Sequence, residues 1–256
     1  MKKLLIVLAA AAALAGCGGK DDGVRTFTVG FDADFPPYGY KDGAEYKGFD
    51  LDLAREVCAR KGWKFVANPI NWDAKDMELN SGAIDCIWNG FTMQGRENAY
   101  TFSAPYVDNS QVVLVKTDSP VVTLADLAGR TVGVQIDTPV QKALSAGGDR
   151  AALGATFKGL VVEPNYNQLV NELVMDAVEA VALDVGVARR KMADLPGTFR
   201  ILDEIIMKET YGIGFKKGNT ALCAEVEAAL REVVADGTMA ALAETYGIEK
   251  DALILK

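Results

Sequence analysis

Residues 82–106 read GAIDCIWNGFTMQGRENAYTFSAPY, and this stretch determines the expected organisation of the chain. Its short apolar run Ile84–Trp88, placed between two glycines, predicts a buried strand. The segment Asn89–Thr92 is turn-prone, so its backbone N–H groups can face a ligand. Arg96 follows and offers a planar fork of donors that matches a carboxylate. The stretch therefore suggests a carboxylate receptor, and a solvated Arg on a surface turn is the alternative.

The N-terminus has the features of an export signal. Two lysines precede the apolar residues 4–14, a run too short to span a bilayer as a stable helix. Residues 14–17, LAGC, resemble a lipoprotein signal site, at which Cys17 is lipidated and becomes the first residue of the mature chain. We therefore expect a signal peptide at residues 1–16, a membrane anchor at Cys17 and a flexible tether at residues 17–25.

Composition and charge exclude several functions. The net charge of -8 and the absence of a Lys/Arg cluster argue against a nucleic-acid partner. The sequence contains no histidine, which excludes Ser-His-Asp and Cys-His catalysis and the common His-containing zinc sites, and we expect no metal or other cofactor. We expect Cys58, Cys86 and Cys223 to be free and buried, although an exported protein can also form one disulfide.

A stiff loop follows the first predicted strand, Thr26–Phe31. Residues 32–38, DADFPPY, contain two prolines that fix the backbone, so Asp32 and Phe35 suit recognition of a polar ligand. A plain surface turn with Phe35 packed inward is the alternative. Further along, Trp72 precedes a predicted helix, where it either covers a ligand or belongs to the core.

Two segments in the second half of the chain are further candidates. Residues 131–135, TVGVQ, predict a strand that ends at Gln135, and Thr138 then precedes a helix whose N-terminus offers free N–H groups to an anion. Capping of that helix explains Thr138 equally well. Asp184 ends another apolar strand, where it either caps the next helix or faces a ligand.

Strands alternate with helices throughout, which predicts an α/β protein with helices on both faces of its sheets. Residues 112–116 and 209–216 are interpreted as strands that cross between two lobes. The predicted lobe 1 comprises residues 26–111 and 216–256. The predicted lobe 2 comprises residues 112–215 and includes the hinge segments.

Helix ends are also predicted from capping residues. Asp50 is expected to cap a helix whose apolar positions share one face, and Asp73 is expected to cap the next helix. Gly82 is expected to end that second helix.

Several motifs, in order, resemble the family 3 bacterial extracellular solute-binding proteins, the polar amino-acid receptors of ABC importers. The central one is GxIDxIxxGxT, followed by an Arg and FSxPY, in residues 82–106. Further matches are D-x-x-Φ-x-P-Φ, where Φ is aromatic, at residues 32–38, GFDxDLA at residues 48–54, and forms close to VGVxxGT and VDAxxxD at residues 132–138 and 178–184.

Two departures accompany this resemblance, which covers residues 26–247. The segment from Thr92 to Arg96 is one residue shorter than usual, and Gly95 can permit the tighter turn. Asp137 stands where the family has Gly.

The resemblance implies a type II periplasmic-binding-protein fold, in which two lobes joined by two crossing strands hold a ligand between them. It assigns three groups of contacts. The ligand carboxylate would meet Arg96, Thr92, Gly90 and Thr138; the ammonium would meet Asp184 and Asn89; the side chain would meet Asp32, Phe35, Trp72 and Gln135.

The resemblance further implies a monomeric, lipid-anchored receptor at the periplasm or cell surface, which delivers an amino acid to an ABC transporter permease. Asp32, with Asp34 and Asp137 in neighbouring loops, favours a basic or amide ligand, because a second ligand carboxylate would be repelled. The alternative is a cyclohexadienyl or arogenate dehydratase-like enzyme on the same fold, with one of these acids as proton donor.

Overall fold

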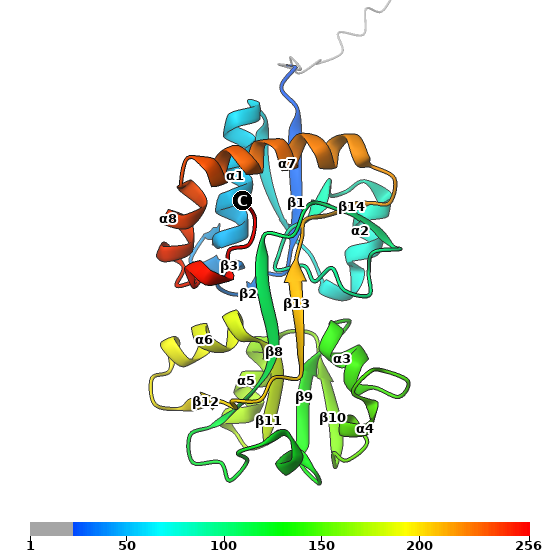
Figure 1. The fold of residues 1–256 in the computed structure, drawn as a ribbon, viewed down its shortest axis with the longest axis vertical. Helices are drawn as coiled ribbons and strands as arrows, with labels where there is room; N and C mark the ends of the chain where they lie inside the picture. Colours follow the sequence, from blue (N-terminus) through cyan, green and yellow to red (C-terminus); the bar gives the residue numbers. More distant parts are fainter. Residues whose placement is uncertain (1–22) are drawn as a thin grey trace, which may run out of the picture.

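The computed structural model describes residues 23–256, and Figure 1 shows them as two lobes placed end to end. The expected signal peptide (residues 1–16), the lipidation site Cys17 and most of the tether (residues 17–25) lie outside the described residues. Within the described part of the chain, no helix is both long enough and apolar enough to cross a bilayer.

The first lobe is built on a five-stranded sheet in the order β5-β1-β6-β14-β7. Its strands are β1 (Thr26–Phe31), β5 (Lys64–Pro69), β6 (Cys86–Ile87), β7 (Tyr100–Phe102) and β14 (Gly214–Lys216). β1 is parallel to β5 and β6, whereas β14 is antiparallel to β6 and β7. Because β14 comes from late in the sequence, this lobe combines the start and the end of the described chain.

Helices cover both faces of this sheet. Successive residues of a strand point to opposite faces, so neighbouring residues of β6 join different cores. Cys86 of β6 joins the core beneath α1 (Phe49–Lys61), α7 (Thr220–Ala235) and α8 (Thr238–Thr245). Ile87, the next residue, joins a separate apolar cluster with Leu79 of α2 (Lys75–Ser81) and Trp72. A small sheet of β2 (Asp34–Phe35), β3 (Gly39–Asp42) and β4 (Glu45–Lys47) lies beside them.

The second lobe contains a six-stranded sheet in which β10, β9, β11, β8 and β12 follow one another and β13 also pairs with β8. The strands are β8 (Val107–Lys116), β9 (Thr131–Gln135), β10 (Gly159–Glu163), β11 (Ala180–Asp184), β12 (Phe199–Ile201) and β13 (Met207–Tyr211). The helices of this lobe are α3 (Pro139–Leu144), α4 (Ala151–Gly154), α5 (Tyr166–Val174) and α6 (Val185–Asp194). In the two lobes together, short 3-10 turns occur at Trp72–Ala74, Leu124–Leu127 and Lys250–Ala252. Every residue of β11 is buried, as expected for a central strand covered on both faces.

β8 and β13 connect the lobes (Figure 1). They are antiparallel, with Val107 opposite Tyr211 and Gln111 opposite Met207, and β8 then continues along β11 and β12. The crossing strand thus begins at Val107, before the predicted start at residue 112. The predicted return segment, residues 209–216, is divided between β13 and β14.

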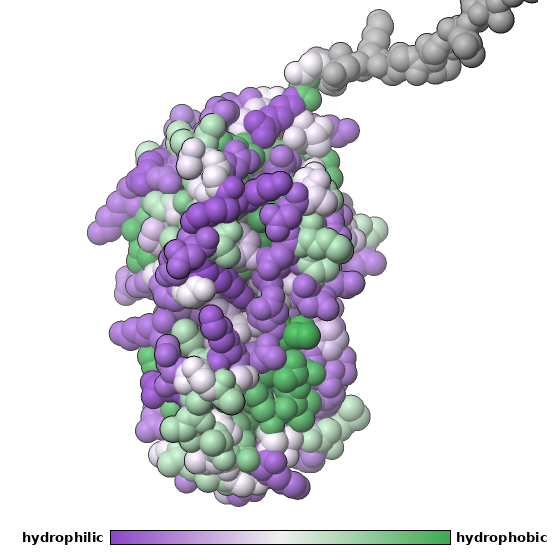
Figure 2. All heavy atoms as spheres, turned by 90° about the vertical axis from the view of Figure 1, so that its right-hand side faces the viewer, coloured by the Kyte–Doolittle hydropathy of each residue, from purple (hydrophilic) through white to green (hydrophobic). Residues whose placement is uncertain are grey.

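Figure 2 shows that the side of the molecule on the right of Figure 1 is mainly hydrophilic, with one hydrophobic area on the second lobe. Buried side chains include Cys58, Cys86 and Cys223, which are free, as predicted. Gly82 ends α2 in the left-handed conformation, with φ 81°, which also confirms its prediction.

Asp50 does not cap α1, contrary to the prediction. The helix begins at Phe49 with Gly48 at its N-cap, and Asp50 is completely buried inside the first turn. Its carboxylate accepts hydrogen bonds from the Gly90 N–H and, at 2.9 Å, from the Tyr106 hydroxyl. Burial raises the pKa of Asp50 to about 7.

The cap predicted at Asp73 is also wrong. α2 begins at Lys75 after a 3-10 turn, its N-cap residue is Ala74, and no side chain caps it.

Candidate ligand-binding site between the lobes

Two cavities open between the lobes, and four of the predicted contact residues line them, namely Arg96, Thr138, Asp32 and Trp72. One, of about 530 Å³, is lined by Arg96 and Lys75 from the first lobe and by Asp137 and Thr138 from the second. The other, of about 580 Å³, is lined by a different set, namely Asp32, Asp34 and Trp72 opposite Pro164 and Asn165. The first cavity therefore has both basic and acidic side chains in its lining, whereas the second offers an acidic wall.

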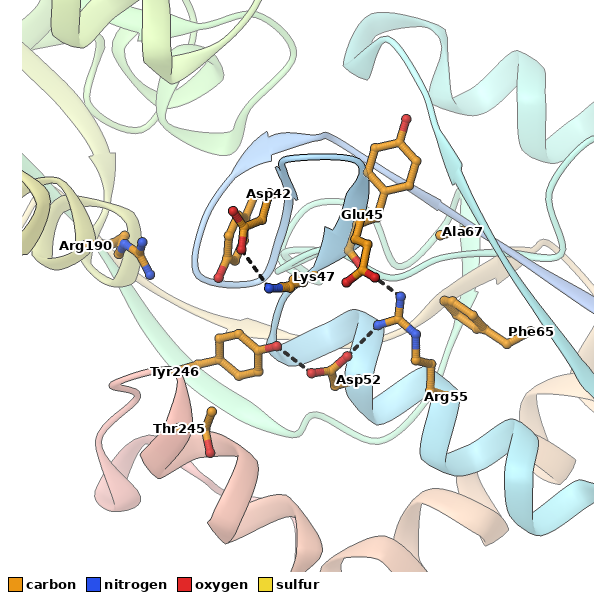
Figure 3. A pocket seen from close by; sticks show the side chains of 12 residues that line it. Asp42, Glu45, Lys47, Asp52, Arg55, Phe65, Ala67, Arg190, Thr245 and Tyr246 are labelled. Carbon is orange, nitrogen blue, oxygen red and sulfur yellow. Dashed lines mark hydrogen bonds and ion pairs between the residues drawn. The ribbon is translucent and has the colours of Figure 1, made fainter.

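A larger cavity, of about 900 Å³, lies elsewhere on the molecule (Figure 3). It is formed by the β3–β4 hairpin, α1 and α8, with Arg190 of the second lobe at its edge. Lys47 pairs with Asp42, and Arg55 pairs with Asp52. None of the predicted contact residues lines this cavity, so the junction between the lobes is the candidate site.

Arg96 extends from the loop between β6 and β7 towards the second lobe. Its guanidinium lies 4.6 Å from the centre of the Phe91 ring and donates hydrogen bonds to the carbonyl oxygens of Thr92 (3.3 Å) and Asp137 (2.8 Å). Gly95 has φ 76°, a left-handed conformation that suits the shortened turn. Withdrawal from water lowers the pKa of Arg96, and the charge of Asp137 opposes this effect.

Asp137 connects the lobes through its backbone and its side chain. It has φ 54°, a conformation that glycine adopts freely, which fits the position where the resemblance expects Gly. Its carbonyl oxygen accepts from Arg96, and its carboxylate pairs with Lys75. Lys75 is 1% exposed, and its Nζ lies 5.2 Å from the centre of the Trp72 ring.

The sequence interpretation missed Lys75. It follows Trp72 by three residues, and this spacing places two side chains on one face of a helix. Lys75 could therefore have been identified from its spacing to Trp72.

Asp184 lies at the end of β11 and is 3% exposed. It is the N-cap residue of α6, as the alternative interpretation predicts, but its side chain makes no capping hydrogen bond. Its carboxylate instead accepts hydrogen bonds from Asn109 Nδ2 (2.9 Å), the Tyr166 hydroxyl (3.3 Å) and the Tyr211 hydroxyl. Burial raises the pKa of Asp184.

Glu209 on β13 is a second buried acid that the sequence interpretation missed. It is 3% exposed and accepts hydrogen bonds from Thr92 Oγ1 (3.0 Å), Gln111 Nε2 (2.7 Å) and Asn109 Nδ2. Burial, followed by the charge of Asp184, raises the pKa of Glu209 to about 8. Glutamate is disfavoured in strands, and its presence in a predicted crossing strand was the available signal.

Asp32 and Gln135 meet across the junction. Gln135 Nε2 donates to Asp32 Oδ2 at 2.6 Å, and the Asp34 N–H donates to Asp32 Oδ1 at 2.8 Å. Burial raises the pKa of Asp32 to about 6. Phe35 packs against Tyr166 of the second lobe, with ring centres 5.9 Å apart.

Other predicted contacts are engaged within the protein. The Gly90 N–H donates to Asp50, and the Thr92 hydroxyl donates to Glu209. Thr138 Oγ1 caps α3 by accepting from Gln141 N–H at 3.3 Å. The buried side-chain amide of Asn89 has no hydrogen-bond partner among the residues that the structure describes.

This architecture defines a class of protein, the two-lobed binding proteins, in which facing polar groups enclose a small ligand at a junction spanned by two strands. The model of the bacterial extracellular solute-binding proteins, family 3, matches residues 27–249, and the chain belongs to this family. The resemblance stated from the motifs is thereby confirmed. The α/β type II periplasmic-binding-protein fold is confirmed by the solved structures.

Similar proteins include the arginine-binding extracellular protein ArtP of Bacillus subtilis, which is 27% identical, with 96% of this chain and 98% of that protein covered. The L-cystine-binding protein TcyJ of Escherichia coli K12 is 27% identical, with 86% of this chain and 82% of that protein covered. An ancestral arginine-binding protein bound to glutamine has a TM-score of 0.79 and 32% identity, over 88% of this chain and 98% of that one. These are binding proteins rather than enzymes, so the dehydratase-like alternative is not favoured.

Replacing Lys75 with Met should weaken contact between the lobes, because Asp137 loses its ion-pair partner while the buried aliphatic chain is retained. A partly exposed pair contributes up to about 1 kcal/mol, which corresponds to a roughly fivefold shift towards separated lobes. Small-angle X-ray scattering without ligand should show a larger radius of gyration. Lys142→Met is the control, because Lys142 lines the same cavity and forms no ion pair in the described part of the chain. Scattering of Lys75→Met identical to wild type would contradict this role.

Proposed function

We propose that this protein is a lipid-anchored receptor that binds a basic or amide amino acid between its lobes and delivers it to an ABC transporter permease. The observation that carries the proposal is the arrangement of opposite charges at the junction. Arg96 lines one cavity, whereas Asp184 and Asp32 are buried acids without an ion-pair partner among residues 23–256. A free amino acid supplies the complementary carboxylate and ammonium.

The assignment of contacts follows from these charges. Arg96 binds the α-carboxylate with two parallel hydrogen bonds, after its guanidinium exchanges the carbonyl oxygens of Thr92 and Asp137 for the ligand. Asp184 binds the α-ammonium. For the predicted contacts Thr92, Gly90 and Thr138, the present hydrogen-bond partners must be exchanged, or the ligand must approach other atoms of these residues. The side-chain amide of Asn89 has no partner to exchange among residues 23–256.

The ligand side chain is proposed to reach Asp32, Phe35, Trp72 and Gln135. With the α-ammonium at Asp184, the carboxylate of Asp32 still lacks a positive partner, which a basic side chain supplies. The aromatic rings provide flat faces for a cation or a planar amide. The names of two similar proteins, an arginine-binding protein and an ancestral arginine-binding protein bound to glutamine, support this choice.

Ligand binding is proposed to stabilise the closed arrangement, because the contacts come from both lobes. Arg96 belongs to the first lobe and Asp184 to the second, so a ligand that bridges them has higher affinity for the closed form. The permease would then recognise the closed shape. We also propose that the protein acts as a monomer, with the lobes divided at residues 111/112 and 215/216.

Thermal-shift titration with the twenty amino acids and cystine tests the proposed ligand specificity. A basic or amide ligand at about 100 times its Kd contributes about 2.7 kcal/mol, which should raise Tm by roughly 5–10 °C. Glutamate and aspartate should have no effect, because their second carboxylate meets the acidic wall. Strongest stabilisation by either of them would exclude the proposed specificity.

Arg96→Ala and Asp184→Ala should each reduce affinity by roughly 30- to 5,000-fold, because truncating one partner of a buried charge pair costs about 2–5 kcal/mol. Isothermal titration calorimetry measures the change, and circular dichroism checks the fold. Arg130→Ala, which removes a surface pair with Glu179, is the matched control. If either site variant stays within a few-fold of wild type, that residue does not contact the ligand.

Cys17→Ser should abolish lipidation of the full chain, since the acyl chain requires the thiol. Metabolic labelling with a fatty acid followed by membrane fractionation measures this. The wild type should carry label and sediment with membranes, and the variant should carry none. An unlabelled wild type would refute the lipid anchor.

A further inference from the structure

Asp184 and Glu209 form an acid pair at the point where the strands cross between the lobes. Asp184 ends β11 and Glu209 lies on β13, and both strands pair with β8. Asp184 is opposite Gln111, and Glu209 is opposite Asn109. Residues two apart on a strand share a face, so all four side chains lie on the same face of the sheet. The hydrogen bonds agree with this register, because Asn109 Nδ2 donates to both acids.

Only neutral groups solvate this pair within residues 23–256. The donors are amide, hydroxyl and phenol groups: Asn109, Tyr166 and Tyr211 donate to Asp184, and Asn109, Gln111 and Thr92 donate to Glu209. No lysine or arginine in this part of the chain lies within ion-pair distance of either acid. The charges of Arg96 and Glu209 interact at longer range than an ion pair.

Two adjacent carboxylates cannot both ionise readily in such a setting, because desolvation and mutual repulsion add. The pair therefore retains one proton near neutral pH, and the raised pKa of Glu209, about 8, agrees with this. Beside the pair, the buried oxygens Asn109 Oδ1 and Gln111 Oε1 have no hydrogen-bond partner within residues 23–256. Carboxylate and amide oxygens together are suited to an ammonium, which donates three hydrogen bonds and carries one positive charge.

We propose that Glu209 is a second acid of the ligand-ammonium site, and that the ligand ammonium replaces the proton held by Asp184 and Glu209. The proposal rests on the proposed amino-acid-binding function and deepens it. In the binding step, the carboxylic acid of Glu209 loses its proton to solvent, and the resulting carboxylate pairs with the incoming –NH3+ group. One ligand bound therefore corresponds to up to one proton released.

The other titratable groups around the pair do not replace Glu209 in this exchange. They come from several elements, and the set comprises Tyr38, Tyr166, Tyr211, Arg96 and Asp32. Burial raises the pKa of each tyrosine well above its usual value, so all three phenols stay protonated. Asp32, with a pKa raised to about 6, is mostly ionised by pH 7.5.

Glu209 also connects the ammonium site to the first lobe. Its carboxylate holds the Thr92 hydroxyl, and Thr92 forms a β-bridge with Tyr211 on the same crossing strand. Proton exchange at Glu209 therefore occurs where both lobes meet.

Calorimetric titration with arginine at pH 7.5, in phosphate and in Tris, tests the proposal. The two buffers differ in ionisation enthalpy, so the difference in observed binding enthalpy gives the number of protons released. We expect roughly 0.5–1 proton for the wild type, because a group with a pKa of about 8 is largely protonated at this pH. Glu209→Gln has the same shape and should release close to none. Glu225→Gln on the surface of α7 should match the wild type.

The pH profile provides a second measurement. Between pH 6.5 and 8, wild-type affinity should rise by up to about tenfold per pH unit, whereas Glu209→Gln should be nearly flat. Wild-type protein that binds arginine without releasing a proton overturns the proposal, whatever the state of the variant. Equal proton release by wild type and Glu209→Gln also overturns it. If the wild type binds no amino acid at all, the proposed function itself fails.

Discussion

Asp32, Asp184 and Glu209 are buried at the junction between the lobes, and no lysine or arginine of residues 23–256 forms an ion pair with any of them. Burial of a carboxylate is costly unless a cation or a proton accompanies it. The cost is reduced here by neutral donors and by raised pKa values. A cationic ligand would reduce this cost further, so the stability of the closed junction depends on the ligand that binds there.

The topology explains how these acids come together. β8 runs from one lobe to the other and pairs with both β11 and β13, so it places Asp184 beside Glu209 although they are far apart in sequence. Asp50 supports the opposite wall, because its buried carboxylate fixes the Gly90 turn that leads to Thr92 and Arg96. The fold thus positions Glu209 on a crossing strand, Asp184 at the end of β11, which pairs with the other crossing strand, and Arg96 on a loop of the first lobe.

Regular elements were predictable from sequence where local patterns determine them. TVGVQ forms β9 with the predicted bounds, and Pro139 begins α3 with Thr138 as its cap. The motif resemblance also predicted the family and the two-lobe fold. Local signals were insufficient for Asp50, whose partners Gly90 and Tyr106 are 40 and 56 residues away.

The candidate site was only partly predictable for the same reason. Arg96, Asp32 and Gln135 line or adjoin the junction, but Lys75 and Glu209 acquire their significance from contacts 62 and 117 residues away, with Asp137 and Thr92. Asp137 occupies a left-handed conformation and carries an ion pair between the lobes, which its place in a motif does not reveal. The sequence thus predicts which segments meet, and the structure shows which atoms face one another.

We propose that one zwitterionic ligand bridges the lobes through fixed charges. A crystal structure of the protein with arginine, grown near pH 8, tests it most directly. We expect the α-carboxylate on the Arg96 guanidinium, the α-ammonium between Asp184 and Glu209, and the side chain directed towards Asp32. Arginine bound in the separate cavity beside α1 and α8, or with its carboxylate away from Arg96, would show that the ligand does not bridge the lobes in this way.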